Sequence, residues 1–216
     1  MKPFGILSIA VGLMVAPLFA DSPAPAHPYV AVAPGGTVFF KMMPRAGGRW
    51  DRPDGFGVAY RVRADGSDEE LWRAEGWYSF EVFLSFDGRY LVAMGPWNGG
   101  HEPKKEDLAV AFYREGKLLK AYSTADLVKD KSKVGASVSH YTWLARDLER
   151  FSPAKKDPEA ELRVFSDDTF RLKTCDGIVY EFDMATGEIK RKKPNQQEKK
   201  AWHPPAMKTP APDRVR

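Results

Sequence analysis

The sequence predicts an all-β fold, an antiparallel meander of hairpins. Pairs of turn-forming residues recur at short intervals, as in the Asp-Gly pairs that begin at Asp65, Asp87 and Asp176. The runs between such pairs are short and rich in Val, Phe, Tyr, Leu and Trp, which is the composition that strands favour. Because each pair favours a tight turn, strands adjacent in the sequence are expected to be neighbours in a sheet.

Residues 29–191 are expected to form a single domain, because a segment of this length holds one hydrophobic core and is short for two. Within it, the segment STADLVKD predicts one short helix, with Ser123 or Thr124 as its N-cap. Two stretches rich in Gly, Pro and charged residues, 44–57 and 146–161, are expected to be long surface loops, the second with room for one helical turn.

The hairpin of residues 78–95 has a predicted register. A two-residue Asp-Gly turn places Phe83 opposite Val92 and Leu84 opposite Leu91. Both faces of this hairpin are then largely apolar, whereas a half-exposed sheet alternates apolar and polar residues. We therefore expect this hairpin to be the central layer of the fold, covered on both sides.

The next hairpin turns at Glu115-Gly116 and is expected to differ, with one apolar face and one mixed face. The predicted apolar face comprises Val110, Phe112, Leu119 and Ala121. The predicted mixed face comprises Ala109, Tyr113, Lys120 and Tyr122.

Three stretches resemble the blades of bacterial β-propellers. LSFDGRYLVA resembles the strand-turn-strand of a blade, DGIVYEFDMATGEI is similar to blades of quinoprotein-like propellers, and YVAVAPGGTVFFKM is a looser third instance. The combination of GPWNGG, SVSHYTW and DGIVYEFDMATGEI also resembles uncharacterised secreted bacterial proteins, a resemblance that brings no activity with it. At roughly 40–45 residues per blade, the body is too short for the four blades that closure needs. The resemblance therefore implies a blade-like or sandwich-like array, an incomplete propeller.

The first twenty residues have the layout of a secretory signal peptide, with Lys2 at the start, an apolar run and a small residue at Ala20. Cleavage is expected between Ala20 and Asp21, and residues 21–28 are expected to be a Pro/Ala-rich linker. An uncleaved membrane anchor is the alternative, but the apolar run is at the short limit for a bilayer span. We therefore expect a secreted or periplasmic protein that is not an integral membrane protein after cleavage.

The C-terminal residues 192–216 are expected to be a disordered, basic, Pro-rich tail. From Lys190 to Arg216 the sequence has nine lysines and arginines against two acidic residues, which leaves the body mildly acidic. The 190–216 segment is suited to contact an anionic surface, with a purely solubilising tail as the alternative. Nucleic acid is not expected as a partner of a secreted protein with an acidic body.

Cys175 is the single cysteine, so the chain forms no intramolecular disulfide. An unpaired cysteine in a secreted protein is either a reactive thiol or a small buried apolar residue. We expect Cys175 to be buried in a strand, because free cysteine is usually buried.

The candidate binding residues come from two stretches that combine aromatic and polar side chains. Rings supply a large contact area at low entropic cost, and a few hydrogen-bonding groups orient the ligand, which suits sugars or peptides. The residues expected to converge on a binding site are Trp97, Asn98, His101, His140, Tyr141 and Trp143, with Trp77 and Tyr78 nearby. The alternative, that these aromatic residues belong to the core, stays open.

No sequence motif of nucleophilic catalysis, zinc binding, phosphate binding or EF-hand calcium binding occurs, so no catalytic residue, metal ligand or cofactor is predicted. His101 and His140 are the two histidines of the body, and no ligand spacing marks them as a metal site. Ser139 and His140 are adjacent on a predicted strand and therefore point to opposite faces, which excludes a nucleophile–base contact between them.

These features predict a non-enzymatic binding or interaction protein that acts on an unknown protein or glycan at the cell envelope. One alternative is an envelope hydrolase with a site around His101 and His140. Another is a structural accessory of an envelope complex, held through its tail. The burial of His140 and Trp97 distinguishes the binding protein from the hydrolase. An open cleft that both residues share with a carboxylate favours a hydrolase, whereas packing of both residues in the core disfavours it.

Overall fold

The computed structural model describes residues 24–47, 53–149 and 157–194. Within these residues lie three four-stranded antiparallel sheets, and in each sheet the strand order follows the chain order. Sheet 1 consists of β1 (Tyr29–Val32), β2 (Val38–Pro44), β3 (Gly55–Val62) and β4 (Asp68–Glu75). Sheet 2 consists of β5 (Val82–Leu84), β6 (Tyr90–Met94), β7 (Leu108–Arg114) and β8 (Lys117–Ser123). Sheet 3 consists of β11 (Arg163–Val164), β12 (Thr169–Lys173), β13 (Val179–Asp183) and β14 (Ile189–Lys193).

The chain between sheets 2 and 3 contains the short elements of the fold. They are α1 (Thr124–Leu127), the 3-10 turn η1 (Lys131–Lys133), the two-stranded ribbon of β9 (Gly135–Ala136) and β10 (Tyr141–Thr142), and α2 (Ala145–Glu149). The prediction of α1 and its cap is confirmed. The Ser123 hydroxyl accepts the Asp126 N–H at 3.1 Å, and the Asp126 carboxylate accepts the Ser123 N–H at 2.9 Å, a reciprocal capping box. The helical turn expected in the predicted loop 146–161 is α2, and residues 150–156 of that loop lie outside the described part.

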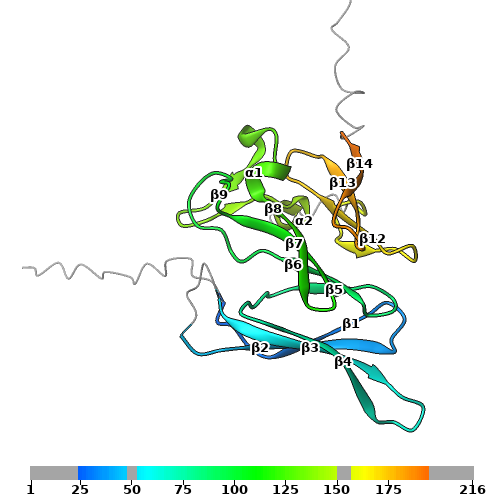
Figure 1. Cartoon of the computed structure of the whole chain (residues 1–216). Coiled ribbons are helices and arrows are strands. Elements are labelled where there is room, and N and C mark those ends of the chain that lie inside the picture. Colours follow the sequence, from blue (N-terminus) through cyan, green and yellow to red (C-terminus); the bar gives the residue numbers. More distant parts are fainter. Residues whose placement is uncertain (1–23, 48–52, 150–156, 195–216) are drawn as a thin grey trace, which may run out of the picture.

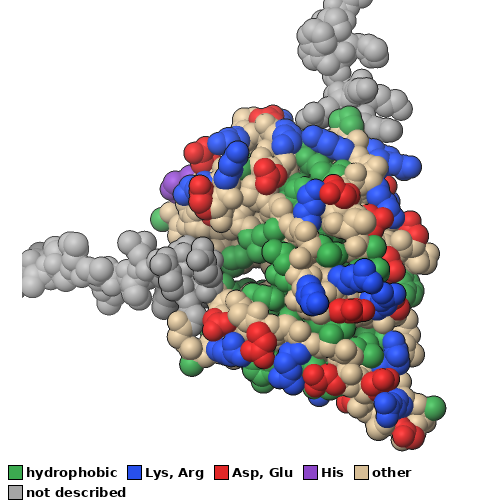
Figure 2. All heavy atoms as spheres, viewed as in Figure 1, with side chains coloured by type: hydrophobic (Ala, Val, Ile, Leu, Met, Phe, Trp, Pro, Cys, Tyr) green, Lys and Arg blue, Asp and Glu red, His purple; other side chains and the backbone are tan. Residues whose placement is uncertain are grey.

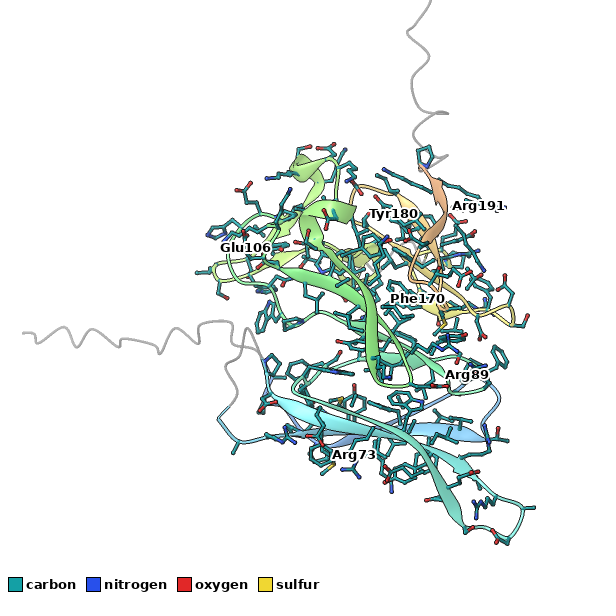
Figure 3. All side chains as sticks on the ribbon, in the orientation of Figure 1. Arg73, Arg89, Glu106, Phe170, Tyr180 and Arg191 are labelled. Atoms are coloured by element: carbon teal, nitrogen blue, oxygen red, sulfur yellow. The ribbon has the colours of Figure 1, made fainter. Side chains whose placement is uncertain are left out.

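Sheet 2 is the middle layer of the three sheets, as predicted (Figure 1). Alternate residues of its β5–β6 hairpin belong to two separate hydrophobic clusters. One cluster packs against sheet 1 and includes Val82, Leu84, Leu91 and Ala93. The other packs against sheet 3 and includes Val92 and Met94. Phe170 and Tyr180 represent sheet 3 in this second cluster, whereas Arg191 is exposed (Figure 3).

The predicted register of the β5–β6 hairpin is confirmed, with Phe83 opposite Val92. Its turn also contacts sheet 1. Gly88 has a φ of +76°, and a Cβ atom there would lie 2.4 Å from a methyl carbon of Val38, so the turn needs glycine for both reasons. The Trp72 indole N–H donates to the Gly88 carbonyl at 2.7 Å. The Asp-Gly turn therefore also joins the first two sheets.

The predicted faces of the β7–β8 hairpin are wrong. A β-bulge between Phe112 and Tyr113 pairs Phe112 with Lys120 instead of Leu119. A shift of one residue exchanges the two faces of a strand. Tyr122 consequently lies on the same side as Phe112, with their ring centroids 6.3 Å apart, and Leu119 is exposed.

The last strand, β14, extends past residue 191, the predicted end of the domain. β14 ends at Lys193, so it includes Lys192 and Lys193, which the sequence places in the tail. Pairing with β13 and an approach of the Lys192 ammonium to 5.5 Å from the Tyr180 ring hold this edge strand. Residues 24–28 of the predicted linker form neither helix nor strand. The predicted signal peptide and residues 195–216 lie outside the described part.

The fold class is therefore all-β, an antiparallel array of blade-like hairpin sheets that does not close into a barrel, as predicted. In the described ranges, no helix is both long and apolar enough to cross a membrane.

Cys175 is half-buried in the turn after β12 rather than in a strand, and it packs against the second cluster. Burial raises the pKa of its thiol to about 12, with the charge of Asp176 adding to the effect. This environment supports the structural interpretation of Cys175 over a reactive thiol.

Candidate functional site

A cleft of about 430 Å³ lies at the end of the β5–β6 hairpin away from its Asp-Gly turn. Its walls come from the residues before β5, the residues after β6, and the chain from β10 to α2. Figure 2 shows a hollow bordered by hydrophobic side chains on this face of the molecule. The apolar lining residues are Phe80, Met94, Pro96, Trp97, Trp143 and Leu144.

The floor of the cleft is fixed where the β5–β6 hairpin ends. The buried Ser79 hydroxyl lies 2.7 Å from the carbonyl oxygens of both Glu81 and Met94, and so it ties the two strands together. Gly95 follows directly, and its N–H donates to the Ala109 carbonyl at 2.8 Å. A Cβ atom on Gly95 would lie 1.8 Å from the Leu108 carbonyl oxygen. Only glycine fits at this position. The close approach of Gly95 to β7 sets the direction of the residues that follow it along the cleft.

Backbone pairing brings the two predicted stretches together. The Gly100 N–H donates to the Ser139 carbonyl at 3.0 Å, and the Tyr141 N–H donates to the Asn98 carbonyl at 3.3 Å. As a result, the Trp97 and His140 rings meet edge to face, with centroids 4.2 Å apart and an interplanar angle of 78°. The two rings form one side of the cleft.

Tyr141 lines the cleft with a hydroxyl that is already engaged. This hydroxyl lies 2.6 Å from Thr124 Oγ1 and donates to the Asp107 carboxylate at 2.7 Å. Burial is the largest cause that raises the Tyr141 pKa, so the hydroxyl stays protonated. The side chain therefore anchors β10 to α1 and to the start of β7.

Trp143 belongs to the same wall and is held from sheet 3. Its carbonyl accepts the Cys175 N–H at 2.7 Å, and the next residue, Leu144, forms a β-bridge with Thr174. Trp143 is only 8% exposed, so one part of the ring belongs to the core and another part lines the cleft. Trp143 therefore belongs both to the hydrophobic core and to the candidate site.

A charged group forms the remaining wall. Arg146 on α2 hydrogen-bonds both carboxylate oxygens of Glu81, one of them at 2.8 Å, and its Nε lies 3.6 Å from an Asp147 carboxylate oxygen. Burial lowers the Arg146 pKa, but the hydrogen bonds and charge of Glu81 together with the charge of Asp147 raise it by more. The guanidinium therefore stays charged, and its bidentate geometry fixes α2 against the hairpin.

Five of the six predicted site residues line this cleft: Trp97, Asn98, His140, Tyr141 and Trp143. The sixth, His101, is exposed on the loop beyond the paired segment and is not part of the lining. Of the two residues expected nearby, Trp77 stacks on Tyr113 and Tyr78 belongs to the first cluster, so both lie outside the cleft lining.

Sequence analysis missed two contacts of this site. The Glu81–Arg146 pair joins residues far apart in the chain, and no local pattern indicates it. The Ser137 hydroxyl lies 2.6 Å from His140 Nδ1, at a spacing of three residues, whereas only the adjacent Ser139 had been considered. A polar residue three positions before a strand histidine is the signal that would have found this contact.

Ser137 is placed for turn stabilisation rather than for attack on a ligand. Its Oγ accepts the N–H groups of His140 at 3.2 Å and of Ser139 at 3.4 Å, as in a hydroxyl-stabilised turn. Ser137 is also absent from the cleft lining. Among the described residues, no group of three or more His, Cys, Asp and Glu side chains is placed to hold a metal ion.

Comparison with known proteins finds similarity at the level of structure. No protein-family model and no curated protein matches the sequence. Among solved structures, the chain is similar to the crystal structure of Sqt1 from Saccharomyces cerevisiae, with 11% sequence identity and a TM-score of 0.27. The match covers 78% of this chain and 51% of that one, so the chain spans about half the length of its structural neighbour.

Proposed function

We propose that the protein is a non-enzymatic binding protein whose ligand occupies the cleft. The observation that carries this proposal is that Trp97, His140 and Trp143, from two distant segments, line one open cleft of about 430 Å³. Ligand sites commonly have volumes of roughly 300–1,000 Å³ and combine apolar walls with a few polar groups. The rings supply contact area, and the Arg146–Glu81 pair on the remaining wall gives the cleft a charged side.

Binding is better supported than hydrolysis because the reactive groups are engaged. Ser137 accepts backbone N–H groups, and the Glu81 carboxylate is held by both terminal nitrogens of Arg146. A glycosidase pair needs one carboxyl that gives up its proton and another that attacks or activates water. A carboxylate in a bidentate pair with arginine suits neither role.

The alternative of an envelope hydrolase is supported by the burial criterion stated for it: His140 and Trp97 line one open cleft together with the carboxylates of Glu81 and Asp147. Its test is an assay of the full chain and of His140→Ala on p-nitrophenyl esters and glycosides. Turnover above background that His140→Ala abolishes would favour the hydrolase over the binding protein.

The proposed place of action is the cell envelope, after secretion directed by residues 1–20, with an unknown protein or glycan as the partner. The exposed lysines and arginine of β14, residues 190–193, are the first residues of the basic 190–216 segment, and this segment suits contact with an anionic surface. Deletion of residues 195–216 tests this contact and the alternative of a structural accessory. Envelope fractionation is expected to change, and an unchanged distribution would remove the segment from the proposal.

The central experiment is a pull-down from envelope extract together with a glycan array, using the full chain. Trp97→Ala is expected to lose the captured ligand, because truncation of an aromatic anchor commonly costs about tenfold or more in affinity. Phe86→Ala is the matched control, since Phe86 is a 38% exposed ring at the opposite end of the same hairpin. Capture that Trp97→Ala leaves intact would contradict a ligand in this cleft.

A further inference from the structure

Two polar side chains in the lining of the cleft are more than nine-tenths buried and make no hydrogen bond within the described part of the chain. Asn98 is 6% exposed and Trp143 is 8% exposed. The side-chain amide of Asn98 and the indole N–H of Trp143 both lack a partner among the described residues. Leaving buried polar groups unpaired is costly, so native proteins rarely do so without a reason. A ligand in the cleft would supply the missing partners.

Both of these groups are open to the cleft. Among the described residues, the side-chain nitrogen and oxygen atoms that are fully enclosed without a partner are the Nε atoms of Arg146 and Arg171. The Asn98 amide and the Trp143 indole nitrogen are not among them, so each keeps some accessible surface. Because both residues line the cleft, a bound molecule can reach this surface.

The unpaired groups are complementary to an amide. A side-chain amide offers N–H donors and a carbonyl acceptor, so Asn98 can pair with both the N–H and the C=O of a ligand amide. An indole N–H only donates, so Trp143 suits a carbonyl oxygen. Met94 and Leu144 are apolar members of the same lining and suit a methyl group beside that carbonyl. Together these residues match an acetamido group.

The charged wall offers hydrogen bonds to hydroxyl groups. Both terminal nitrogens of Arg146 donate to the Glu81 carboxylate. Each carboxylate oxygen keeps a second lone pair, and each terminal nitrogen keeps a second N–H. The side chains of Arg146 and Glu81 are 28% and 34% exposed, so a ligand can reach them. Hydroxyl groups both donate and accept, and they can therefore bind both members of the pair.

A sugar ring with an acetamido group carries everything that these walls require. Its acetamido group matches Asn98 and Trp143, its hydroxyl groups match the Arg146–Glu81 pair, and its C–H face can pack on the half-buried Trp97 ring. A peptide main chain supplies amides, but it supplies hydroxyl groups only through particular side chains. A sugar without the acetamido group supplies hydroxyl groups and leaves the Asn98 amide without a matching amide.

We propose that the cleft binds an acetamido sugar, with the N-acetyl group at Asn98 and Trp143 and the ring on Trp97. The proposal rests on the proposed function and names the ligand class of that site. Asn98 is then the residue that determines specificity for the acetamido group, whereas Trp97 supplies affinity for any sugar ring.

The test is an NMR titration of the full chain that follows the indole N–H signals. The probes are N,N′-diacetylchitobiose, cellobiose and N-acetylalanine methylamide. Cellobiose has the same ring linkage with hydroxyl groups in place of the acetamido groups, and the alanine derivative has amides without hydroxyl groups. We expect N,N′-diacetylchitobiose to bind at least about tenfold more tightly than either of the other probes, because only this probe pairs with both walls.

Two variants separate recognition of the acetamido group from stacking. Asn98→Ala is expected to weaken binding of N,N′-diacetylchitobiose at least about tenfold and to leave the affinity for cellobiose unchanged. The backbone carbonyl of Asn98, which accepts the Tyr141 N–H, is kept in this variant. Trp97→Ala is expected to weaken both sugars to a similar extent, because it removes only the ring on which they stack.

The controls address folding and position. Phe86→Ala, at the opposite end of the hairpin, is expected to leave all affinities unchanged. Asn98→Asp keeps the size of the side chain and removes its N–H donors, so it retains the test if Asn98→Ala fails to fold. Far-UV circular dichroism of each variant is the folding measurement.

The outcomes separate this inference from the proposed function. Equal affinities for the two disaccharides, or a preference that Asn98→Ala leaves unchanged, would overturn recognition of the acetamido group and leave the binding protein standing. Binding of the alanine derivative alone would overturn the sugar in favour of a peptide. If no probe binds, the acetamido sugar is excluded, and the proposed function is decided by the pull-down and the array.

Discussion

The Trp97 and His140 rings contact each other edge to face although they come from different stretches of the chain, and the contact depends on backbone pairing between those stretches. Gly99 and His140 form the bridge that sets this arrangement. The side-chain contact is therefore a consequence of the fold, and either ring can be changed while the pairing of the backbone remains.

His140→Ala is expected to leave the fold intact and to loosen Trp97. The aromatic pair contributes about 0.5–1.5 kcal/mol beyond the area it buries, and the contact of His140 Nδ1 with the Ser137 hydroxyl is lost as well. The free energy of unfolding should therefore fall by about 1–2 kcal/mol. The Trp97 indole should become more mobile, which nitrogen-15 relaxation of its N–H measures. An unchanged relaxation rate would show that other contacts hold Trp97 in place.

Gly95→Ala is expected to destabilise the protein strongly. The added methyl group would lie 1.8 Å from the Leu108 carbonyl oxygen, and backbone atoms on β7 must move to admit it. We expect the free energy of unfolding to fall by about 2 kcal/mol or more, measured by urea denaturation. Gly35→Ala is the control, since its nearest neighbour would be a Phe86 carbon at an ordinary 3.8 Å. Equal stability of the two variants would contradict the close approach at Gly95.

Tyr180 is expected to make stability depend on alkaline pH. Burial, with a smaller effect of Asp176, raises its pKa from 10.0 to about 12, while its hydroxyl donates to the Leu127 carbonyl at 2.6 Å. In the unfolded chain the tyrosine ionises near pH 10, but the folded protein keeps the proton up to about 12. This stabilisation is therefore complete below pH 10 and is lost as the pH rises from 10 to 12. Tyr180→Phe should flatten the decline in melting temperature across this window, and an equally steep decline would assign it to other groups.

Cys175 is expected to react slowly with thiol reagents in the folded protein. Its pKa rises from 9.0 to about 12, so at pH 8 the thiolate fraction should be roughly a thousandfold below that of a free cysteine. Ellman's reagent on native and urea-unfolded protein measures the difference. A native rate close to the unfolded rate would mean that the thiol is exposed and ionised.

Local signals predicted much of the fold. The Asp87-Gly88 turn fixes its own register, so the pairing of Phe83 with Val92 and the two apolar faces followed from a few adjacent residues. The bulge at Phe112 did not follow, because an added residue in a ladder depends on what the strand packs against. Here Gly187 lies so close that a Cβ atom on it would be 3.1 Å from the Cβ of Phe112.

The candidate site was predictable only in part, because some of its contacts also depend on tertiary packing. Trp97 and His140 were recognisable as unusual aromatic and polar residues in glycine-flanked or strand-like stretches. The Arg146–Glu81 pair depends on where α2 lies against the hairpin, and nothing in either stretch encodes that placement. His101 carries the right chemistry, but it lies just beyond the paired segment, where the side chain is exposed.

The middle position of sheet 2 has a consequence for how the molecule loses its structure. Val92 and Leu91 are neighbours in one strand, yet they belong to different hydrophobic clusters. Because both clusters contain residues of the same strand, unfolding of one cluster should also unfold the other. The described part of the chain should behave as one cooperative unit, and the cleft at the end of that shared hairpin exists only while both clusters are intact.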